Sequence, residues 1–254
     1  MDTLTNIVLP WLDMDTPLPP AASALRTPAQ LSGLVAAGGD LSTSRLQEAY
    51  SQGIFPWFNH DQPVLWWSPD PRMVLHTAAF RIHRSLKKTL LKFKAGSDGE
   101  IRIDSAFDRV IRHCANAPRQ GNPGTWIGED MIHAYQALHR LGLAHSVETW
   151  INGELAGGLY CVALGHAVFG ESMFSLQTDA SKIALAALVA FARHHEVRWI
   201  DCQQNTRHLA SLGAQEMPRA NFIHAVHQAS AKPALNWRFQ SLYWNSLFPE
   251  SSLT

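Results

Sequence analysis

The chain has 254 residues, of which 46 % are hydrophobic, so it can bury the core of one large domain or two unequal ones, and a disordered chain is excluded. Its 21 Lys and Arg residues balance 21 Asp and Glu residues, which excludes a surface covered throughout with nucleic-acid-binding charge and leaves only local basic patches. The three cysteines form no C-x-x-C pair, and we find neither a basic signal peptide nor a typical membrane-spanning segment, so we expect a soluble cytoplasmic protein without membrane contact.

The chain up to residue 71 is predicted to form a small N-terminal α/β domain with an aromatic cluster. Residues 10–30 are rich in Pro and Ala and indicate an extended arm. Ser42 is an N-cap residue for a helix that Gly53 ends. The aromatic residues of 54–67 precede a proline-containing turn, after which we place the domain boundary.

The sequence predicts that residues 72–254 form a larger α/β (α+β) domain with a mixed, mostly antiparallel sheet. Helices are expected where apolar residues recur at helical spacing, over 80–94, 107–114, 129–141 and a long segment after Asp179. Strands are expected where the period changes, over 146–150, 155–164, 167–174 and 197–202, with a hairpin turn at Asn152-Gly153.

This order of three antiparallel strands, a helix and a further strand is that of N-acetyltransferase-like (GNAT-like) folds. A coenzyme-A enzyme of that fold needs a glycine-rich turn whose N–H groups bind a pyrophosphate at the start of the helix. Here the turn over 175–179 has no glycine and ends in Asp179. We therefore expect an acyl donor other than coenzyme A, and no cofactor.

Several segments together resemble one family, the leucyl/phenylalanyl-tRNA–protein transferases. They follow the family order over roughly residues 25 to 225, and Cys161 is a departure, because glycine is expected there. The segments are Gly38-Gly39-Asp40-Leu41-Ser42, Gly53-Ile54-Phe55-Pro56-Trp57, Leu65-Trp66-Trp67-Ser68-Pro69-Asp70-Pro71-Arg72, Gly124-Thr125-Trp126-Ile127, Ala144-His145-Ser146-Val147-Glu148, Gly157-Gly158-Leu159-Tyr160, Gly170-Glu171-Ser172-Met173-Phe174-Ser175, Ala180-Ser181-Lys182, Asp201-Cys202-Gln203 and Ser211-Leu212-Gly213-Ala214.

The resemblance implies an enzyme that moves Leu or Phe, and less readily Met, from aminoacyl-tRNA to proteins that begin with Arg or Lys. It also implies that the modified proteins are marked for degradation through their N-terminal residue. The donor is an activated ester, so this reaction needs no ATP. Positioning the amine against the carbonyl can by itself supply about 7–11 kcal/mol of the barrier.

Asp201 and Gln203 are the catalytic residues that the resemblance implies. They lie two apart on the last predicted strand, so both side chains are expected on one face. The Asp201 carboxylate would orient Gln203, which would position the attacking amine. Proton relay through the tRNA 2′-hydroxyl is an alternative. A purely structural role, with Asp201 at a loop and Gln203 at the surface, also stays open.

Glu171 stands in a predicted strand of small and apolar residues, where a carboxylate needs a partner. It is a candidate for binding the ammonium or basic side chain of the acceptor. The alternative is an internal salt bridge to Lys182 or Arg207.

Two tryptophans, Trp57 and Trp126, are candidates for stacking on the terminal adenosine of tRNA, although either could be a core residue. The amino-acid side chain needs an adaptable apolar pocket. Residues available for it from the sheet and the following helix are Leu159, Phe169, Met173 and Leu188.

A basic helix face is a candidate for tRNA phosphate contacts, and the alternative is an ordinary solvated face. It carries Arg84, Lys87, Lys88 and Lys92.

Other functions fit the residues less well. The spacing of His133 and His139, and of the adjacent His194 and His195, does not suit a helical zinc site, so no metal is expected. The sequence around Glu171 is not the nucleophile elbow of a serine hydrolase. Another acyltransferase of the same core, or a non-enzymatic RNA-binding module, remain the rivals.

Overall fold

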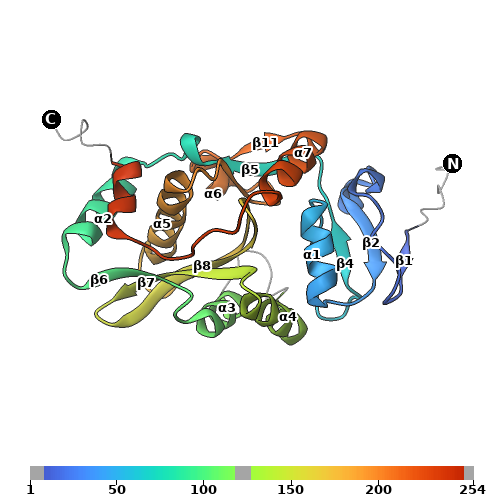
Figure 1. The fold of residues 1–254 in the computed structure, drawn as a ribbon, viewed down its shortest axis with the longest axis horizontal. Coiled ribbons are helices and arrows are strands. Elements are labelled where there is room, and N and C mark those ends of the chain that lie inside the picture. The colour runs from blue at the N-terminus through green and yellow to red at the C-terminus, as the bar shows by residue number, and fades with distance from the viewer. Residues whose placement is uncertain (1–8, 118–126, 249–254) are drawn as a thin grey trace.

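The computed structural model describes residues 9–117 and 127–248, which form two sheets with helices around them (Figure 1). The smaller sheet has four strands in the order β1-β2-β4-β3, and the larger has seven in the order β11-β5-β10-β9-β8-β7-β6. The mixed α/β fold expected from the sequence is confirmed. Among the described residues, no helix has both the length and the apolar character needed to span a bilayer.

The N-terminal part contains the small sheet and one helix. Its elements are β1 (Trp11–Leu12), β2 (Leu34–Gly38), α1 (Thr43–Ser51), β3 (Phe55–Pro56) and β4 (Leu65–Trp67). The Ser42 side chain accepts a hydrogen bond from the backbone N–H of Arg45, so the predicted N-cap is confirmed. Gly53, just past the helix, has a positive φ of 72°, which glycine adopts at little cost.

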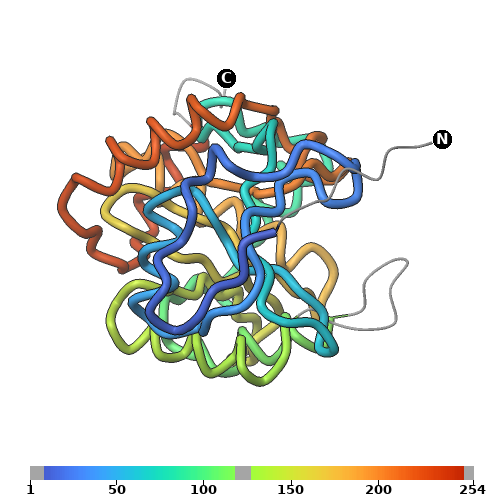
Figure 2. Tube along the Cα trace, turned by 90° about the vertical axis from the view of Figure 1, so that its right-hand side faces the viewer, coloured from blue at the N-terminus to red at the C-terminus, as the bar shows by residue number. Residues whose placement is uncertain are grey.

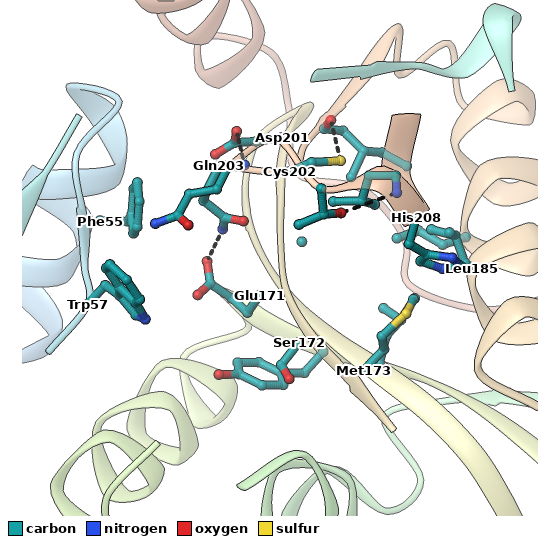
Figure 3. Close-up of a pocket in the computed structure, with 18 of the residues that line it drawn as sticks. Phe55, Trp57, Glu171, Ser172, Met173, Leu185, Asp201, Cys202, Gln203 and His208 are labelled. Carbon is teal, nitrogen blue, oxygen red and sulfur yellow. Dashed lines mark hydrogen bonds between the residues drawn. The ribbon is translucent and has the colours of Figure 1, made fainter. Parts of the chain in front are cut away.

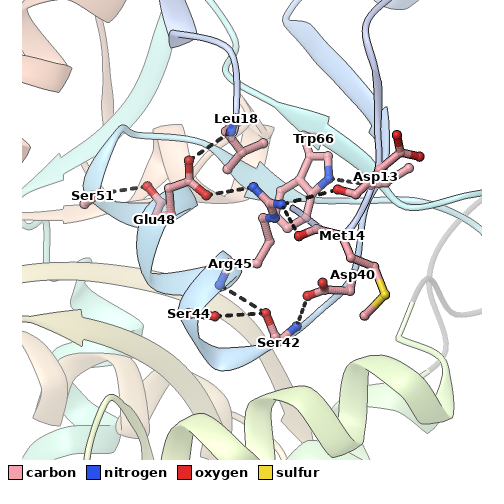
Figure 4. Close-up of polar contacts among 11 residues, drawn as sticks. Asp13, Met14, Leu18, Asp40, Ser42, Ser44, Arg45, Glu48, Ser51 and Trp66 are labelled. Atoms are coloured by element: carbon pink, nitrogen blue, oxygen red, sulfur yellow. Dashed lines mark hydrogen bonds and ion pairs between the residues drawn. The ribbon is translucent and has the colours of Figure 1, made fainter. Parts of the chain in front are cut away.

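The proline-rich arm is fastened to α1 rather than extended into solvent (Figure 4). The Arg45 guanidinium is buried and donates to the carbonyl oxygens of Asp13, at 3.5 Å, and Met14, at 3.0 Å. Arg45 also pairs with Glu48 at 2.8 Å, and Glu48 accepts a bond from the backbone N–H of Leu18 at 2.9 Å. These contacts satisfy backbone groups of the arm that no regular structure would pair.

The larger part contains the remaining elements. They are β5 (Arg72–His76), α2 (Arg84–Ala95), β6 (Gly99–Ile103), α3 (Phe107–Asn116), α4 (Glu129–Arg140), β7 (Ala144–Ile151), β8 (Glu154–Leu164), β9 (Ala167–Ser175), α5 (Ala180–His194), β10 (Trp199–Asp201), α6 (Arg207–Ser211), β11 (Gln215–Met217), α7 (Arg219–Ser230) and the 3-10 helix η4 (Ser241–Ser246). The predicted helices and strands are present, with shifted ends. The sequence did not indicate β5, β6, α6, β11, α7 or η4.

The large sheet is mostly antiparallel. β6, β7, β8 and β9 pair antiparallel in turn, whereas β10 pairs parallel with β9 because α5 carries the chain back across the sheet. β5 and β11 then extend the sheet beyond β10 with antiparallel pairing. The predicted order of three antiparallel strands, a helix and a further strand is therefore confirmed.

The β8–β9 pairing contains a bulge that decides which side chains share a face. Tyr160 lies opposite Ser172, but the next residue, Cys161, lies opposite Gly170, so Glu171 has no partner across the ladder. An extra residue reverses the alternation of side chains beyond it. Phe169 and Met173, four residues apart, therefore face opposite sides of the sheet.

Helices cover both faces of the large sheet (Figure 1). α5, with α2 and η4 beside it, covers one face, whereas α3 and α4 cover the other. The core on the α3–α4 side is continuous with that of the small sheet, because one buried cluster includes Trp66 from β4, Tyr50 from α1 and Phe169 from β9. Figure 2 shows the blue and cyan N-terminal part lying across one end of the larger part.

Candidate active site

A cavity of about 600 Å³ lies where β9 and β10 separate, between α5 on one side and β3 of the small sheet on the other (Figure 3). Its lining is mainly apolar, with Glu171 and Gln203 at one end and His208 beside Leu185 at the other (Figure 3). Residues from six elements and from the segments after β3 and β10 line it: Phe55, Trp57, Asn59, Leu159, Tyr160, Gly170, Glu171, Ser172, Met173, Leu185, Leu188, Ile200, Asp201, Cys202, Gln203, Gln204, Thr206, His208 and Leu209.

The carboxylate of Glu171 is at the polar end and comes from the bulge of β9. It accepts hydrogen bonds from the Tyr50 hydroxyl at 2.8 Å, the Tyr135 hydroxyl at 3.2 Å and the Gln203 side-chain amide at 3.1 Å. Burial raises the pKa of Glu171 to about 7, against an opposing effect of the Tyr50 hydrogen bond. The salt bridge considered from the sequence does not form with Lys182, which pairs with Asp179 at 2.7 Å.

Tyr50 and Tyr135 are functional candidates that the sequence did not single out. They come from α1 and α4, both are fully buried, and their hydroxyl oxygens are 2.5 Å apart. Burial and the neighbouring Glu171 raise the pKa of each tyrosine well above its ordinary value, so both hydroxyls stay protonated. No local motif marks such residues, because they resemble any other aromatic core position of a helix.

Asp201 is fully buried and is held by Arg72 of β5. The Arg72 guanidinium donates to both carboxylate oxygens, at 2.8 and 2.6 Å, and it also donates to the carbonyl oxygen of Gly53 at 3.1 Å. The guanidinium lies between the rings of Phe55 and Phe222, 4.7 and 4.6 Å from their centroids. This geometry combines a bidentate ion pair with two cation–π contacts.

The expectation that Asp201 and Gln203 lie on one strand was wrong, because β10 ends at Asp201. Gln203 has a positive φ of 53°, and its backbone N–H donates to an Asp201 oxygen at 3.0 Å. The carboxylate therefore fixes the backbone of Gln203, while the side-chain amide is free to turn toward Glu171, as Figure 3 shows.

Three of the four predicted pocket residues, Leu159, Met173 and Leu188, line the cavity. The prediction for Phe169 was wrong: its ring packs against Tyr50 and Trp199 on the other side of the sheet, because the bulge reverses the alternation. Leu185 and Ile200 line the same apolar end and were missed. Leu185 was detectable, since it lies one helical turn before Leu188.

Trp57 lines the cavity next to Phe55, with 38 % of its surface exposed, and its ring packs edge-on against Trp67 at 5.7 Å. An exposed ring at a cavity mouth suits stacking, but adenosine binding stays a prediction. Trp126 lies outside the described residues.

The basic face of α2 is exposed, and in the described part of the chain none of its four cations forms an ion pair. Leu86 and Leu90 are buried beneath it, whereas Arg84, Lys87, Lys88 and Lys92 face solvent. Thr89 of α2 donates to Asp179, at the start of α5, at 3.3 Å. The basic face is thus attached to the helix that forms one wall of the cavity.

Within residues 9–117 and 127–248, no three His, Cys, Asp or Glu side chains are grouped as metal ligands would be.

Comparison with known proteins identifies the family. A family model described as leucyl/phenylalanyl-tRNA protein transferase matches residues 74–227, and one for the N-terminal domain of these proteins matches residues 39–70. The chain is 57 % identical to the leucyl/phenylalanyl-tRNA–protein transferase of Polaromonas sp. strain JS666, over 94 % of each chain. It is 58 % identical to that of Albidiferax ferrireducens, over 97 % of each chain.

A solved structure of a GCN5-related N-acetyltransferase from Kribbella flavida aligns with a TM-score of 0.32 and 9 % identity, over 68 % of this chain and 60 % of that one. The fold assignment rests on the strand order described above. On the family models and the high identity to named relatives, the chain belongs to the leucyl/phenylalanyl-tRNA–protein transferase family of enzymes.

Proposed function

We propose that the enzyme transfers Leu or Phe, and less readily Met, from aminoacyl-tRNA to the N-terminal Arg or Lys of acceptor proteins. The product carries a new peptide bond and is marked for degradation through its N-terminus. Family membership supports the general reaction, which is aminoacyl transfer from tRNA to a protein. The observation that supports the finer proposal is one cavity with an apolar end and a carboxylate beside an amide at its other end.

The apolar end accounts for the choice of amino acid. Leu159, Met173, Leu185, Leu188 and Ile200 surround it without a charged group among them. Methionine adapts to ligands of different shape, which suits a pocket that accepts Leu, Phe and Met. Because an apolar pocket distinguishes one methylene by only about 1–3 kcal/mol, rejection of β-branched side chains has to come from shape.

The polar end accounts for the acceptor. Glu171 supplies negative charge for an N-terminal ammonium or a basic side chain, while the charge of Asp201 is neutralised by Arg72. Gln203 is the group that positions the attacking amine, with Asp201 holding its backbone. The aminoacyl ester is already activated, so ATP, metal and coenzyme A are not required. The tRNA 2′-hydroxyl remains a competing path for the proton.

The rest of the tRNA would be bound at the mouth of this cavity and beyond it. Stacking of the terminal adenosine on Trp57, and on Trp126, would contribute about 1–3 kcal/mol per base and would serve every tRNA alike. Phosphates would contact Arg84, Lys87, Lys88 and Lys92 of α2, which suits a protein of zero net charge that has to hold a polyanion. A charged tRNA substrate implies a cytoplasmic reaction.

The proposal is tested by mixing the protein with labelled Phe-tRNA and a peptide that begins with Arg, in the presence of a chelator. We expect a peptide product one Phe longer, and no product when the peptide is N-acetylated. Binding of the charged tRNA without transfer would indicate the RNA-binding module, and no transfer by folded protein would contradict the proposal. Transfer to Arg-starting and Ala-starting peptides at equal rates would contradict the acceptor specificity.

A further inference from the structure

Three oxygen-bearing side chains at the polar end of the cavity form a closed ring. The Tyr50 hydroxyl contacts one Glu171 oxygen at 2.8 Å, the Tyr135 hydroxyl contacts the other at 3.2 Å, and the two hydroxyls contact each other at 2.5 Å. The tyrosines are buried behind Glu171, whereas Glu171 itself faces the cavity. The ring therefore connects buried proton donors to a carboxylate that substrate can reach.

The number of protons in the ring depends on Glu171. With Glu171 ionised, two hydroxyl protons serve three oxygen–oxygen contacts, so one contact lacks a proton of its own. With Glu171 protonated, its O–H can donate to Tyr135, Tyr135 to Tyr50, and Tyr50 back to Glu171, so every contact carries a proton. Both states can be reached by rotating hydroxyls, without moving the backbone.

The charged groups around the ring distinguish Glu171 from the other carboxylate of the cavity. Both oxygens of Asp201 are bound by the Arg72 guanidinium, so this carboxylate already has a charged partner. Gln203 presents a neutral amide to Glu171. Among the described residues that line the cavity, Glu171 is consequently the carboxylate available to gain and lose a proton.

We infer that Glu171 is the proton shuttle of the transfer reaction, with Tyr50 and Tyr135 as positioning residues that stabilise both of its protonation states. This inference rests on the proposed function. Glu171 takes one proton from the α-ammonium of the acceptor, and the neutral amine attacks the ester carbonyl. The C–N bond forms, and the bond to the ribose 3′-oxygen breaks as that oxygen receives the proton held by Glu171. The second amine proton is then released to the ionised Glu171 or to solvent.

The proton affinities suit a shuttle. An N-terminal amine has an ordinary pKa of about 7.7–8.0, and burial raises the pKa of Glu171 to about 7. Proton transfer from the ammonium to Glu171 is then unfavourable by only about tenfold, and the protonated acid remains strong enough to protonate the leaving oxygen. A carboxyl with its ordinary pKa of 4.5 would make the first step unfavourable by more than a thousandfold.

The active state holds one proton shared between amine and Glu171, which predicts a bell-shaped dependence of rate on pH. In single-turnover transfer with both substrates saturating, wild type should have its maximum between about pH 7 and 8. Glu171→Gln should be slower by about 10²–10⁴-fold and should lose the alkaline limb, its rate rising to a plateau as the amine deprotonates. Its binding of charged tRNA should be unchanged.

Tyr50→Phe and Tyr135→Phe should move the acid limb to higher pH, because each removes a hydrogen bond that lowers the pKa of Glu171. Tyr243→Phe, which alters a buried tyrosine of η4, should keep the wild-type profile and controls for loss of a hydroxyl as such. A bell-shaped dependence of the transfer rate on pH that is retained in Glu171→Gln would overturn the inference. The inference would also be overturned if Glu171→Gln lost activity only through a higher KM for the acceptor, since such a change would indicate a role in binding alone.

An infrared titration of the free protein tests the same group without activity. After subtraction of the Glu171→Gln spectrum, the carbonyl band of a protonated carboxyl should appear as the pH falls through about 7. A carboxyl that stays ionised below pH 5 would overturn the shuttle even in an active enzyme. If wild type transferred no aminoacyl group, the proposed function would fail while the infrared result still decided whether Glu171 exchanges protons near neutrality.

Discussion

Removing the Arg72 side chain should be among the most destabilising single changes in this protein. Arg72 and Asp201 are both fully buried, so Arg72→Met would leave a carboxylate without its partner away from water. Breaking a buried ion pair in this way costs about 3–5 kcal/mol, and loss of the two ring contacts adds to that. Against a total stability of about 5–15 kcal/mol, the variant should unfold at markedly lower urea concentration.

Replacing both partners should have a much smaller effect than the single change. A well-packed apolar pair in place of a buried ion pair is often neutral or stabilising, so Arg72→Met with Asp201→Leu should regain most of the lost stability. The coupling energy in the double-mutant cycle should be about 3 kcal/mol or more. Additive losses in urea unfolding would refute the reasoning, since they would mean that the two groups do not depend on each other.

The double variant also separates stability from function. It lacks the oxygen that accepts the backbone N–H of Gln203, whereas Arg72→Met with Asp201→Asn keeps an acceptor there. Both lose the same bond to Gly53, so that loss cancels in the comparison. We expect both to fold and to bind charged tRNA, but the double variant that carries Asp201→Leu should have the lower kcat by tenfold or more. Equal kcat values would show that Asp201 does not act through Gln203.

Four further predictions concern single parts of the site. The folded-state pKa of Glu171, about 7, exceeds the ordinary 4.5, so the stability that this carboxyl contributes is present below pH 4.5 and is lost as the pH rises through 7. At pH 8 the free energy of unfolding of Glu171→Gln, measured in urea, should therefore exceed that of wild type by up to about 3 kcal/mol, and the difference should disappear at pH 4.5. Gln203→Ala should lower kcat by one or more orders of magnitude with little change in tRNA affinity, and an unchanged kcat would make Gln203 structural. Removing Lys87 and Lys88 should weaken tRNA binding and reduce the slope of log affinity against log salt by up to about 2, whereas an unchanged slope would indicate a solvated face. Met173→Ala should change the ratio of Leu to Phe transfer in a competition assay, and an equal loss of both would place Met173 outside the amino-acid pocket.

Local pattern in the sequence determined much of the fold. The capped helix α1, the hairpin of β7 and β8, the long helix α5 and the family motifs all depend on residues close together in the chain. Burial on one face repeats with the period of a helix or strand, so periodicity reveals these elements without knowledge of their neighbours. The predicted sheet and the helix after it also supplied Leu159, Met173 and Leu188 as pocket candidates, and all three line the cavity.

The tertiary structure alone decided what the reactive side chains contact. Arg72 meets Asp201 from 129 residues away, and Tyr50 meets Glu171 from 121 residues away, through a sheet order that no local pattern encodes. Phe169 was predicted to line the same pocket as Met173, but a single bulge at Glu171 places the two side chains on opposite faces of the sheet. Register and strand order are set by the packing of the whole chain, and for that reason the partners of Glu171 and Asp201 could not be predicted from the residues around them.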